Sequence, residues 1–254
     1  MIPLLIFILG ACFGSFLNVC IYRIPKKLSI FTPRSFCVNC KTPIKPWENI
    51  PFISYILLRG KCSTCKAKIS PRYFIVELLT AIIYLLVFRR FGFGLPLMTY
   101  LFFSSLLIII TFIDLEHQLI LNKITHSGII LGLLASFLLP NLSLFQSLLG
   151  GLMGGLVIYF LHLLSLLLFR KVGMGGGDLK LAILLGVFLG WKNLLLSLLI
   201  ASFTGGIVGS ILIFLRIKKR TDYIPYGPYL CLGAMVVLLW GEDIISWYKG
   251  WLFG

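Results

Sequence analysis

The amino-acid sequence predicts an all-α polytopic membrane protein with about eight transmembrane helices and one small cytoplasmic module between the first two. The chain has 254 residues, of which 59% are hydrophobic and only 12% are charged, and its mean hydropathy is +1.02. About a quarter of the residues of an ordinary soluble domain are charged. Apolar runs near the ~20 residues that cross a bilayer recur along this chain. These observations exclude a single soluble core.

Eight apolar runs are predicted to cross the membrane. They comprise residues 2–21, 73–88, 95–113, 126–140, 145–169, 179–191, 194–215 and 228–241. The first run lacks a basic region before it and continues past any small-residue cleavage site, so we expect a retained span rather than a cleaved signal peptide. The predicted organisation is therefore a first helix at 1–21, a polar module at 22–72 and a transmembrane core at 73–254.

The net charge of +15 is predicted to reflect membrane topology and not a nucleic-acid partner. If the N-terminus lies outside, only Arg89, Arg90, Lys192 and Lys249 among the 23 Lys and Arg residues fall on the outer side. Such an excess of basic residues in cytoplasmic loops follows the positive-inside rule. We therefore expect a multi-pass protein of the lipid bilayer whose polar loops face the cytoplasm.

Four of the seven cysteines form two Cys-x-x-Cys pairs in the polar module, "CVNC" (37–40) and "CSTC" (62–65). Each pair can chelate a metal ion from one tight turn, and two pairs complete a tetrahedral site. A segment this short needs such a source of folding free energy, and disulfides rarely persist in the cytoplasm. We predict structural zinc, with two disulfides or an iron–sulfur cluster as alternatives. The ligands would be Cys37, Cys40, Cys62 and Cys65.

Two of the eight acidic residues are predicted at the cytoplasmic ends of different spans. Asp114 ends the run "LLIIITFI", and Asp178 opens the run "LKLAILLGVFLG". An ionisable group near hydrocarbon normally faces a polar interior, and equal depth allows a bundle to bring the two together. Two carboxylates that share a site share a proton, so one can activate water while the other protonates a scissile carbonyl. The alternative is a pair of interfacial carboxylates. Nearby His117 and Lys180 receive no predicted role.

Glycines crowd around Asp178 in "GMGGGD" (173–178). The segment fails the G-x-G-x-x-G nucleotide fingerprint, because Asp178 occupies the place of the third glycine and no strand precedes it. Glycine permits close backbone approach. We therefore predict an unwound wall along which an extended substrate backbone lies, with a flexible hinge as the alternative. The residues of this wall would be Gly173, Gly175, Gly176 and Gly177.

Five segments carry a resemblance to a known family. They are "GSFLNVCIYRIP" (14–25), "FCVNCKTPIKPWENIPFISYILLRGKCSTCKAKISPRYFIVE" (36–77), "FIDLEHQLI" (112–120), "GMGGGDLKL" (173–181) and "IPYGPYL" (224–230). In this order they resemble the prepilin peptidases (type IV leader peptidases), membrane aspartyl proteases of the G-x-G-D class. One departure is Ile120-Leu121-Asn122, where the family usually has Ile-Pro-Asn.

The resemblance implies an aspartic endopeptidase with Asp114 and Asp178 as its catalytic pair. The implied substrates are type IV prepilins or pseudopilins of pilus, type II secretion and competence systems. Their basic leaders would be cut after a glycine at the cytoplasmic face of the bacterial inner membrane. In many members the same chain then methylates the new N-terminus with S-adenosylmethionine, and the cysteine module accompanies that variant.

Two other functions are compatible with the carboxylates. A transporter or channel could use Asp114 and Asp178 as a proton or cation relay, although this leaves the cysteine module and the glycines unexplained. The other is a membrane methyltransferase or pilus assembly factor without peptidase activity.

Overall fold

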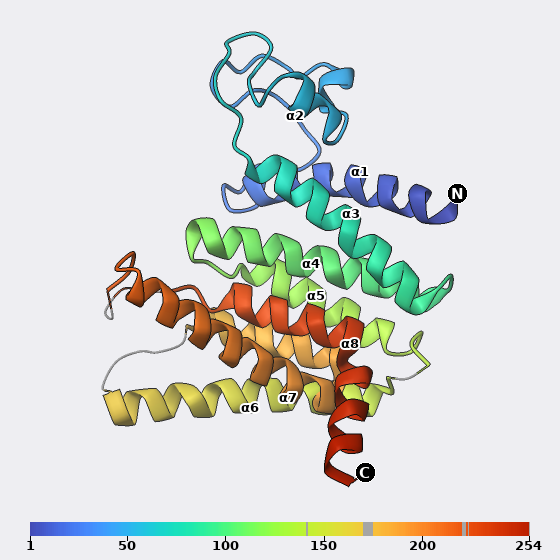
Figure 1. Ribbon diagram of the computed structural model, residues 1–254, viewed down its shortest axis with the longest axis vertical. Helices are drawn as coiled ribbons and strands as arrows, with labels where there is room; N and C mark the ends of the chain where they lie inside the picture. Colours follow the sequence, from blue (N-terminus) through green and yellow to red (C-terminus); the bar gives the residue numbers. More distant parts are fainter. Residues whose placement is uncertain (141, 170–174, 220–221, 223, 254) are drawn as a thin grey trace. The chain divides into compact units, whose positions relative to one another are not determined.

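The computed structural model describes residues 1–140, 142–169, 175–219, 222 and 224–253 (Figure 1). These residues form helices and two isolated β-bridges, and none of them belongs to a strand. The elements are α1 (Ile2–Arg23), η1 (Pro46–Asn49), α2 (Ile53–Leu57), α3 (Arg72–Phe91), α4 (Leu95–His117), α5 (Asn122–Ala135), α6 (Leu144–Phe169), α7 (Gly176–Phe214) and α8 (Gly227–Phe253). The all-helical prediction is confirmed. Contacts divide the chain into two units, 1–109 and 110–254, and the boundary falls within α4.

Five helices of the described chain are long and apolar enough to cross a membrane: α1, α4, α6, α7 and α8. The predicted run 73–88 lies in α3, which carries arginines at both ends. The predicted run 126–140 overlaps α5, which has only 14 residues. The structure thus supports a multi-pass helical protein, while the count of eight spans stays a prediction.

A kink at Gly190 divides α7 and accounts for two of the predicted runs, 179–191 and 194–215. Gly190 has φ 73° and ψ 165°, so the helical backbone is interrupted there. This φ lies in the left-handed region, where a side chain would be strained and glycine is not. The segment that carries Asp178 is therefore a short helix, continuous in the chain with a second helix after the kink.

In the unit 1–109, α1 and α3 lie side by side with their backbones nearly in contact (Figure 1). A Cβ atom on Gly14 would come within 2.7 Å of the Cα atom of Glu77, so only glycine allows this approach. Asn18 Nδ2 donates a hydrogen bond to the Tyr73 carbonyl (3.0 Å) across the same interface. The buried Glu77 carboxylate accepts a 2.9 Å hydrogen bond from the Phe52 N–H at the start of α2. Glu77 thereby fixes the cysteine module to α3.

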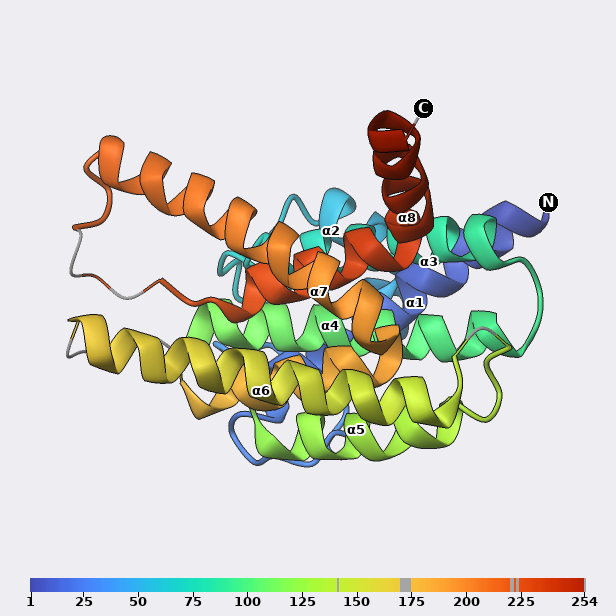
Figure 2. The same cartoon turned by 90° about the horizontal axis from the view of Figure 1, so that it is seen from below.

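In the unit 110–254, α6 packs along α7, and α7 packs against α8 (Figure 2). Gly150 of α6 faces Gly186 of α7 so closely that a Cβ atom on either would overlap the other's carbonyl group. One turn further, Gly154 meets the Ala182 carbonyl in the same way, and Ser147 Oγ donates a 2.7 Å hydrogen bond to the Val187 carbonyl. Small residues and interhelical hydrogen bonds are what hold membrane helices together when the surroundings are themselves apolar. This crossing fixes the helix that presents Asp178.

Gly186→Ala is expected to lower the stability of the protein by about 1–3 kcal/mol, because the added methyl group has no space at the α6–α7 crossing. Gly206→Ala is the matched control in the same helix, since a Cβ atom there meets nothing within 4 Å. The control should be neutral or slightly stabilising, by up to about 1 kcal/mol. Thermal unfolding in detergent measures both variants, and equal midpoints would contradict the close crossing.

Candidate active site and metal centre

Asp114 lies in the last turn of α4 and is only 3% exposed. Its carboxylate accepts a hydrogen bond from the backbone N–H of Gly227, the first residue of α8. The first N–H groups of a helix have no partner within the helix and attract negative charge. A Cβ atom on Gly227 would lie 2.5 Å from Asp114 Oδ2. Glycine at this position therefore allows the backbone to reach the carboxylate.

Asp178 is the third residue of α7 and is likewise 3% exposed. Its Oδ2 atom accepts a 3.0 Å hydrogen bond from the N–H of Gly175, the residue that caps α7. In return, the Asp178 N–H donates to the Gly175 carbonyl at 3.1 Å. This reciprocal pair is the arrangement of a capping box, although glycine contributes only its backbone. The side chain is thus held in one orientation at the start of the helix.

The structure brings the two predicted aspartates together, since their carboxylates interact electrostatically. Ile120, in the turn between α4 and α5, lies between the segments that carry them. A Cβ atom on Gly177 would come within 2.9 Å of Ile120 Cβ, and one on Gly227 would come within 3.3 Å of Ile120 Cδ1. Ile120 therefore packs against both glycines, one beside Asp178 and the other beside Asp114.

A polar contact joins the same elements. Lys180 Nζ donates a 2.7 Å hydrogen bond to Asn122 Oδ1, which links the first turn of α7 to the first residue of α5. Leu121, the residue before Asn122, has φ −78° and ψ 126°. Proline would impose nearly the same φ. The extended backbone before α5 is therefore retained although leucine stands where the family usually has proline.

The predicted glycine wall is only partly described, because Gly173 lies outside the described residues. Gly175 has φ −81° and ψ 158°, which is ordinary extended backbone. Gly176 and Gly177 form the first turn of α7, so this part of the segment is helical and not unwound as predicted. A Cβ atom on Gly176 would meet nothing within 4 Å, whereas Gly177 must be small because of Ile120. Of these glycines, Gly177 therefore serves close approach, and none of the three has positive φ.

Sequence reasoning missed the positioning roles of Gly227, Ile120, Asn122 and Lys180. Nothing in the segment "IPYGPYL" marks the Gly227 N–H as a partner of Asp114. Lys180 is two residues from Asp178 and so not on the same helical face, which gives no signal of a role. Its contact with Asn122 depends on how α5 and α7 pack. His117, the last residue of α4, is exposed.

The four predicted ligands form a compact cluster in which all Sγ atoms lie within 4.8 Å of one another. The Sγ atoms of Cys37 and Cys65 are 3.9 Å apart, and those of Cys40 and Cys62 are 4.0 Å apart. A tetrahedral ion with Zn–S bonds of about 2.3 Å requires S···S separations of about 3.8 Å. All four are free thiols, so the cluster fits a metal ion and the disulfide alternative is not observed.

The two Cys-x-x-Cys turns are built alike. The Cys37 and Cys62 N–H groups each donate at 2.9 Å to a carbonyl five residues on, at Thr42 and Ala67. The lysine after each pair, Lys41 or Lys66, has positive φ (59° and 58°).

Hydrogen bonds in these turns favour the thiolate, the form that binds metal, at Cys40 and Cys62. At Cys37 the backbone hydrogen bond with Cys40 lowers the pKa, but burial and the neighbouring thiols of Cys40 and Cys62 raise it, and the net shift is upward. The Thr42 hydroxyl, 3.2 Å from Cys40 Sγ, and the Thr42 backbone lower the pKa of Cys40 to about 6. The N–H groups of Cys65 and Thr64 lower the pKa of Cys62. Hydrogen bonds to the ligand sulfurs hold them in the orientation that a metal ion requires.

Comparison with known proteins gives consistent matches along the chain. The Bacterial Peptidase A24 N-terminal domain matches residues 8–91, and the Type IV leader peptidase family matches residues 101–210. A protein of Legionella pneumophila named prepilin leader peptidase/N-methyltransferase is 38% identical, over 94% of this chain and 91% of its own. Proteins of the same name are 37% identical in Aeromonas hydrophila (96% and 92%) and in Pseudomonas aeruginosa (95% and 91%).

No solved structure matches the chain. The sequence matches nevertheless cover both the cysteine module and the segments with the two aspartates, at identities and coverages that establish common ancestry. The chain therefore belongs to the type IV leader peptidase family.

Proposed function

We propose that this protein cleaves the basic leader peptide from type IV prepilins or pseudopilins and then methylates the new N-terminus. The observation that carries the proposal is the pair of buried carboxylates, Asp114 and Asp178, each held by a backbone N–H at the start of a helix. The names of the relatives, which cover nearly the whole chain, support both activities. The transporter alternative is not favoured, because none of these relatives carries such a name.

The proposed setting is the bacterial inner membrane, with the N-terminus outside and the aspartates at the cytoplasmic face. The distribution of Lys and Arg supports this orientation, and the five long apolar helices suit a bilayer. In this proposal the chain has eight membrane segments: α1, α3, α4, α5, α6, the two halves of α7, and α8. It is organised into a first helix (1–21), a zinc module (22–72) and a protease core (73–254). A pilin helix in the bilayer with its leader in the cytoplasm would meet the aspartates at the inner interface.

In the proposed mechanism the two carboxylates share one proton. The ionised one takes a proton from a water molecule, whose oxygen attacks the scissile carbonyl carbon, while the protonated one donates its proton to the carbonyl oxygen. The tetrahedral intermediate then collapses: the C–N bond breaks, the leaving amine takes up the proton that the first carboxylate had accepted, and one hydroxyl of the intermediate returns its proton to the second carboxylate as the new carbonyl forms. The N–H groups of Gly175 and Gly227 hold the carboxylates in place throughout. The glycines from Gly175 to Gly177 would leave room for the substrate backbone.

The cysteine cluster would hold zinc on Cys37, Cys40, Cys62 and Cys65. Four thiolates leave no open coordination position, so the ion would stabilise the module rather than act in catalysis. In the proposed second reaction, S-adenosylmethionine would supply the methyl group.

Asp114→Asn and Asp178→Asn are each expected to lower the rate of leader cleavage by roughly 10²–10⁴-fold, because either change removes one member of the acid–base pair. Cleavage is measured by gel shift and N-terminal mass after co-expression with a prepilin. Asp222→Asn is the control, since this carboxylate is exposed and accepts a hydrogen bond from the Lys219 N–H of its own loop. Normal cleavage by either of the first two variants would contradict the catalytic pair.

Lys180→Met and Asn122→Ala are each expected to reduce kcat by roughly 2- to 10-fold, since a hydrogen bond at an exposed position contributes about 0.5–1.5 kcal/mol. The double variant should be no slower than the single ones, because both remove the same contact. Asn122→Asp keeps an acceptor for Lys180 and should retain most of the activity. Additive losses in the double variant would show that the two residues act separately.

Replacing Cys37 and Cys40 together by serine is expected to abolish zinc binding and N-methylation while leader cleavage continues. Elemental analysis should find one zinc ion per wild-type chain and none in the double variant. Mass spectrometry of the processed pilin reports the methyl group. Replacing the buried Cys231 by serine controls for loss of a thiol elsewhere and should leave the zinc content unchanged. Full zinc content in the double variant would contradict the four-cysteine site.

A further inference from the structure

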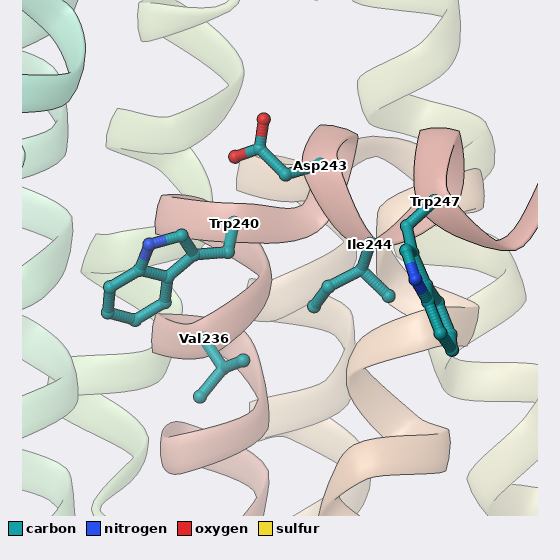
Figure 3. Close-up of a pocket in the computed structure, with 5 residues that line it drawn as sticks. All are labelled: Val236, Trp240, Asp243, Ile244 and Trp247. Atoms are coloured by element: carbon teal, nitrogen blue, oxygen red, sulfur yellow. The ribbon is translucent and has the colours of Figure 1, made fainter. Parts of the chain in front are cut away.

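The last part of α8 does not continue in the direction of its first part. Between Trp240 and Trp247 the helix turns away from the direction that α5, α6 and the beginning of α8 share (Figures 1, 2 and 3). A straight helix with the 27 residues of α8 would be about 40 Å long, which exceeds the ~30 Å of bilayer hydrocarbon. If the shared direction crosses the membrane, the turned segment runs along the membrane surface.

One apolar stripe follows α8 through this turn. Its members are spaced by four, four, three and four residues, which keeps them on one helical face; they are Val236, Trp240, Ile244, Trp247 and Trp251. Trp247 and Trp251 are 72% and 74% exposed in the isolated chain, and Trp240 is 46% exposed. The stripe is therefore not covered by the rest of the protein. Large exposed aromatic side chains in such a row require another partner.

The turn makes the stripe concave. Val236, Trp240, Ile244 and Trp247 line a pocket of about 460 Å³ together with Asp243 (Figure 3). Asp243 is its one polar lining residue and lies at the edge of the stripe, whereas Glu242, Ser246 and Lys249 occupy the opposite face of the helix. An apolar aromatic face opposite a charged one is typical of helices that lie in a lipid–water interface. Trp and Tyr concentrate at this depth of the bilayer, and Tyr248 adds to them.

We propose that the segment from Glu242 to Trp251 is an interfacial anchor, with phospholipid covering its aromatic stripe and entering the pocket at the turn. The segment lies at the end of α8 opposite to Gly227. The first part of α8 then connects the anchor at one membrane face to Gly227, whose backbone N–H binds Asp114 near the opposite membrane face. The anchor fixes the depth of α8 in the bilayer, and this conclusion does not depend on the reaction at the aspartates.

The depth of Trp247 and Trp251 tests the proposal. The chain has five tryptophans, and replacing four by phenylalanine leaves either Trp247 or Trp251 as the single fluorophore. Each variant is reconstituted into phosphatidylcholine–phosphatidylglycerol vesicles whose acyl chains are brominated at carbons 6 and 7 or at carbons 11 and 12. A variant with Trp47 alone, which lies in the polar module and is exposed, serves as the aqueous reference.

An interfacial anchor predicts quenching about twofold or more stronger with the shallow bromines for both Trp247 and Trp251, because such a helix sinks about 5–10 Å into the headgroup boundary. The two residues should also lie at equal depth. A helix that continued straight would separate them by about 6 Å, and unequal depths would overturn the proposal. The absence of quenching by either lipid would also overturn the proposal. Unquenched tryptophans with blue-shifted emission would indicate that a second copy of the chain covers the stripe, and unquenched tryptophans with red-shifted emission would indicate that the stripe faces water. Thermal unfolding confirms that the variants remain folded.

Discussion

Two carboxylates in an apolar helical bundle need hydrogen-bond partners, and the arrangement of residues 110–254 provides one for each. An isolated ionised group in low dielectric is costly. Here the partners are backbone N–H groups at the starts of α7 and α8, which no residue within those helices can satisfy. Glycine at Gly227 lets the backbone approach the Asp114 carboxylate directly, and the Gly175 N–H binds Asp178 at 3.0 Å. The helix ends, the α4–α5 turn and the close α6–α7 crossing are therefore parts of one arrangement around Asp114 and Asp178.

The two aspartates and the four cysteines were predictable because each belongs to a local pattern. Asp114 stands at the end of an uncharged run and Asp178 beside a glycine cluster. Both patterns can be recognised in the sequence without knowing how the helices pack. The Cys-x-x-Cys turns are local as well, so that their ligands could be identified from spacing alone. The contacts that hold the aspartates could not be found in this way. Ile120 touches Gly177 and Gly227, and Lys180 touches Asn122, only because of how the segments pack.

The fold was predicted correctly in type and less well in its boundaries. Hydropathy indicated both interruptions, because polar residues follow each of them. Lys192 and Asn193 separate the predicted runs 179–191 and 194–215 close to Gly190, whose positive φ divides α7. Glu242 and Asp243 likewise end the predicted run 228–241 where α8 turns between Trp240 and Trp247 (Figure 3). Hydropathy does not show that the helix continues beyond each interruption. In the polar module, the positive φ of Lys41 and Lys66 reflects the tight turns that bring the thiols together.

The kink at Gly190 has a consequence for the membrane itself. The helix that begins at Gly176 and carries Asp178 ends after about 14 residues, so its length is about 21 Å, well short of the ~30 Å hydrocarbon thickness. Such a hydrophobic mismatch is relieved when the bilayer thins around the short element. Thinning would draw the aqueous boundary toward the carboxylates. Water would then reach a peptide bond at the edge of the lipid without any polar channel through the protein.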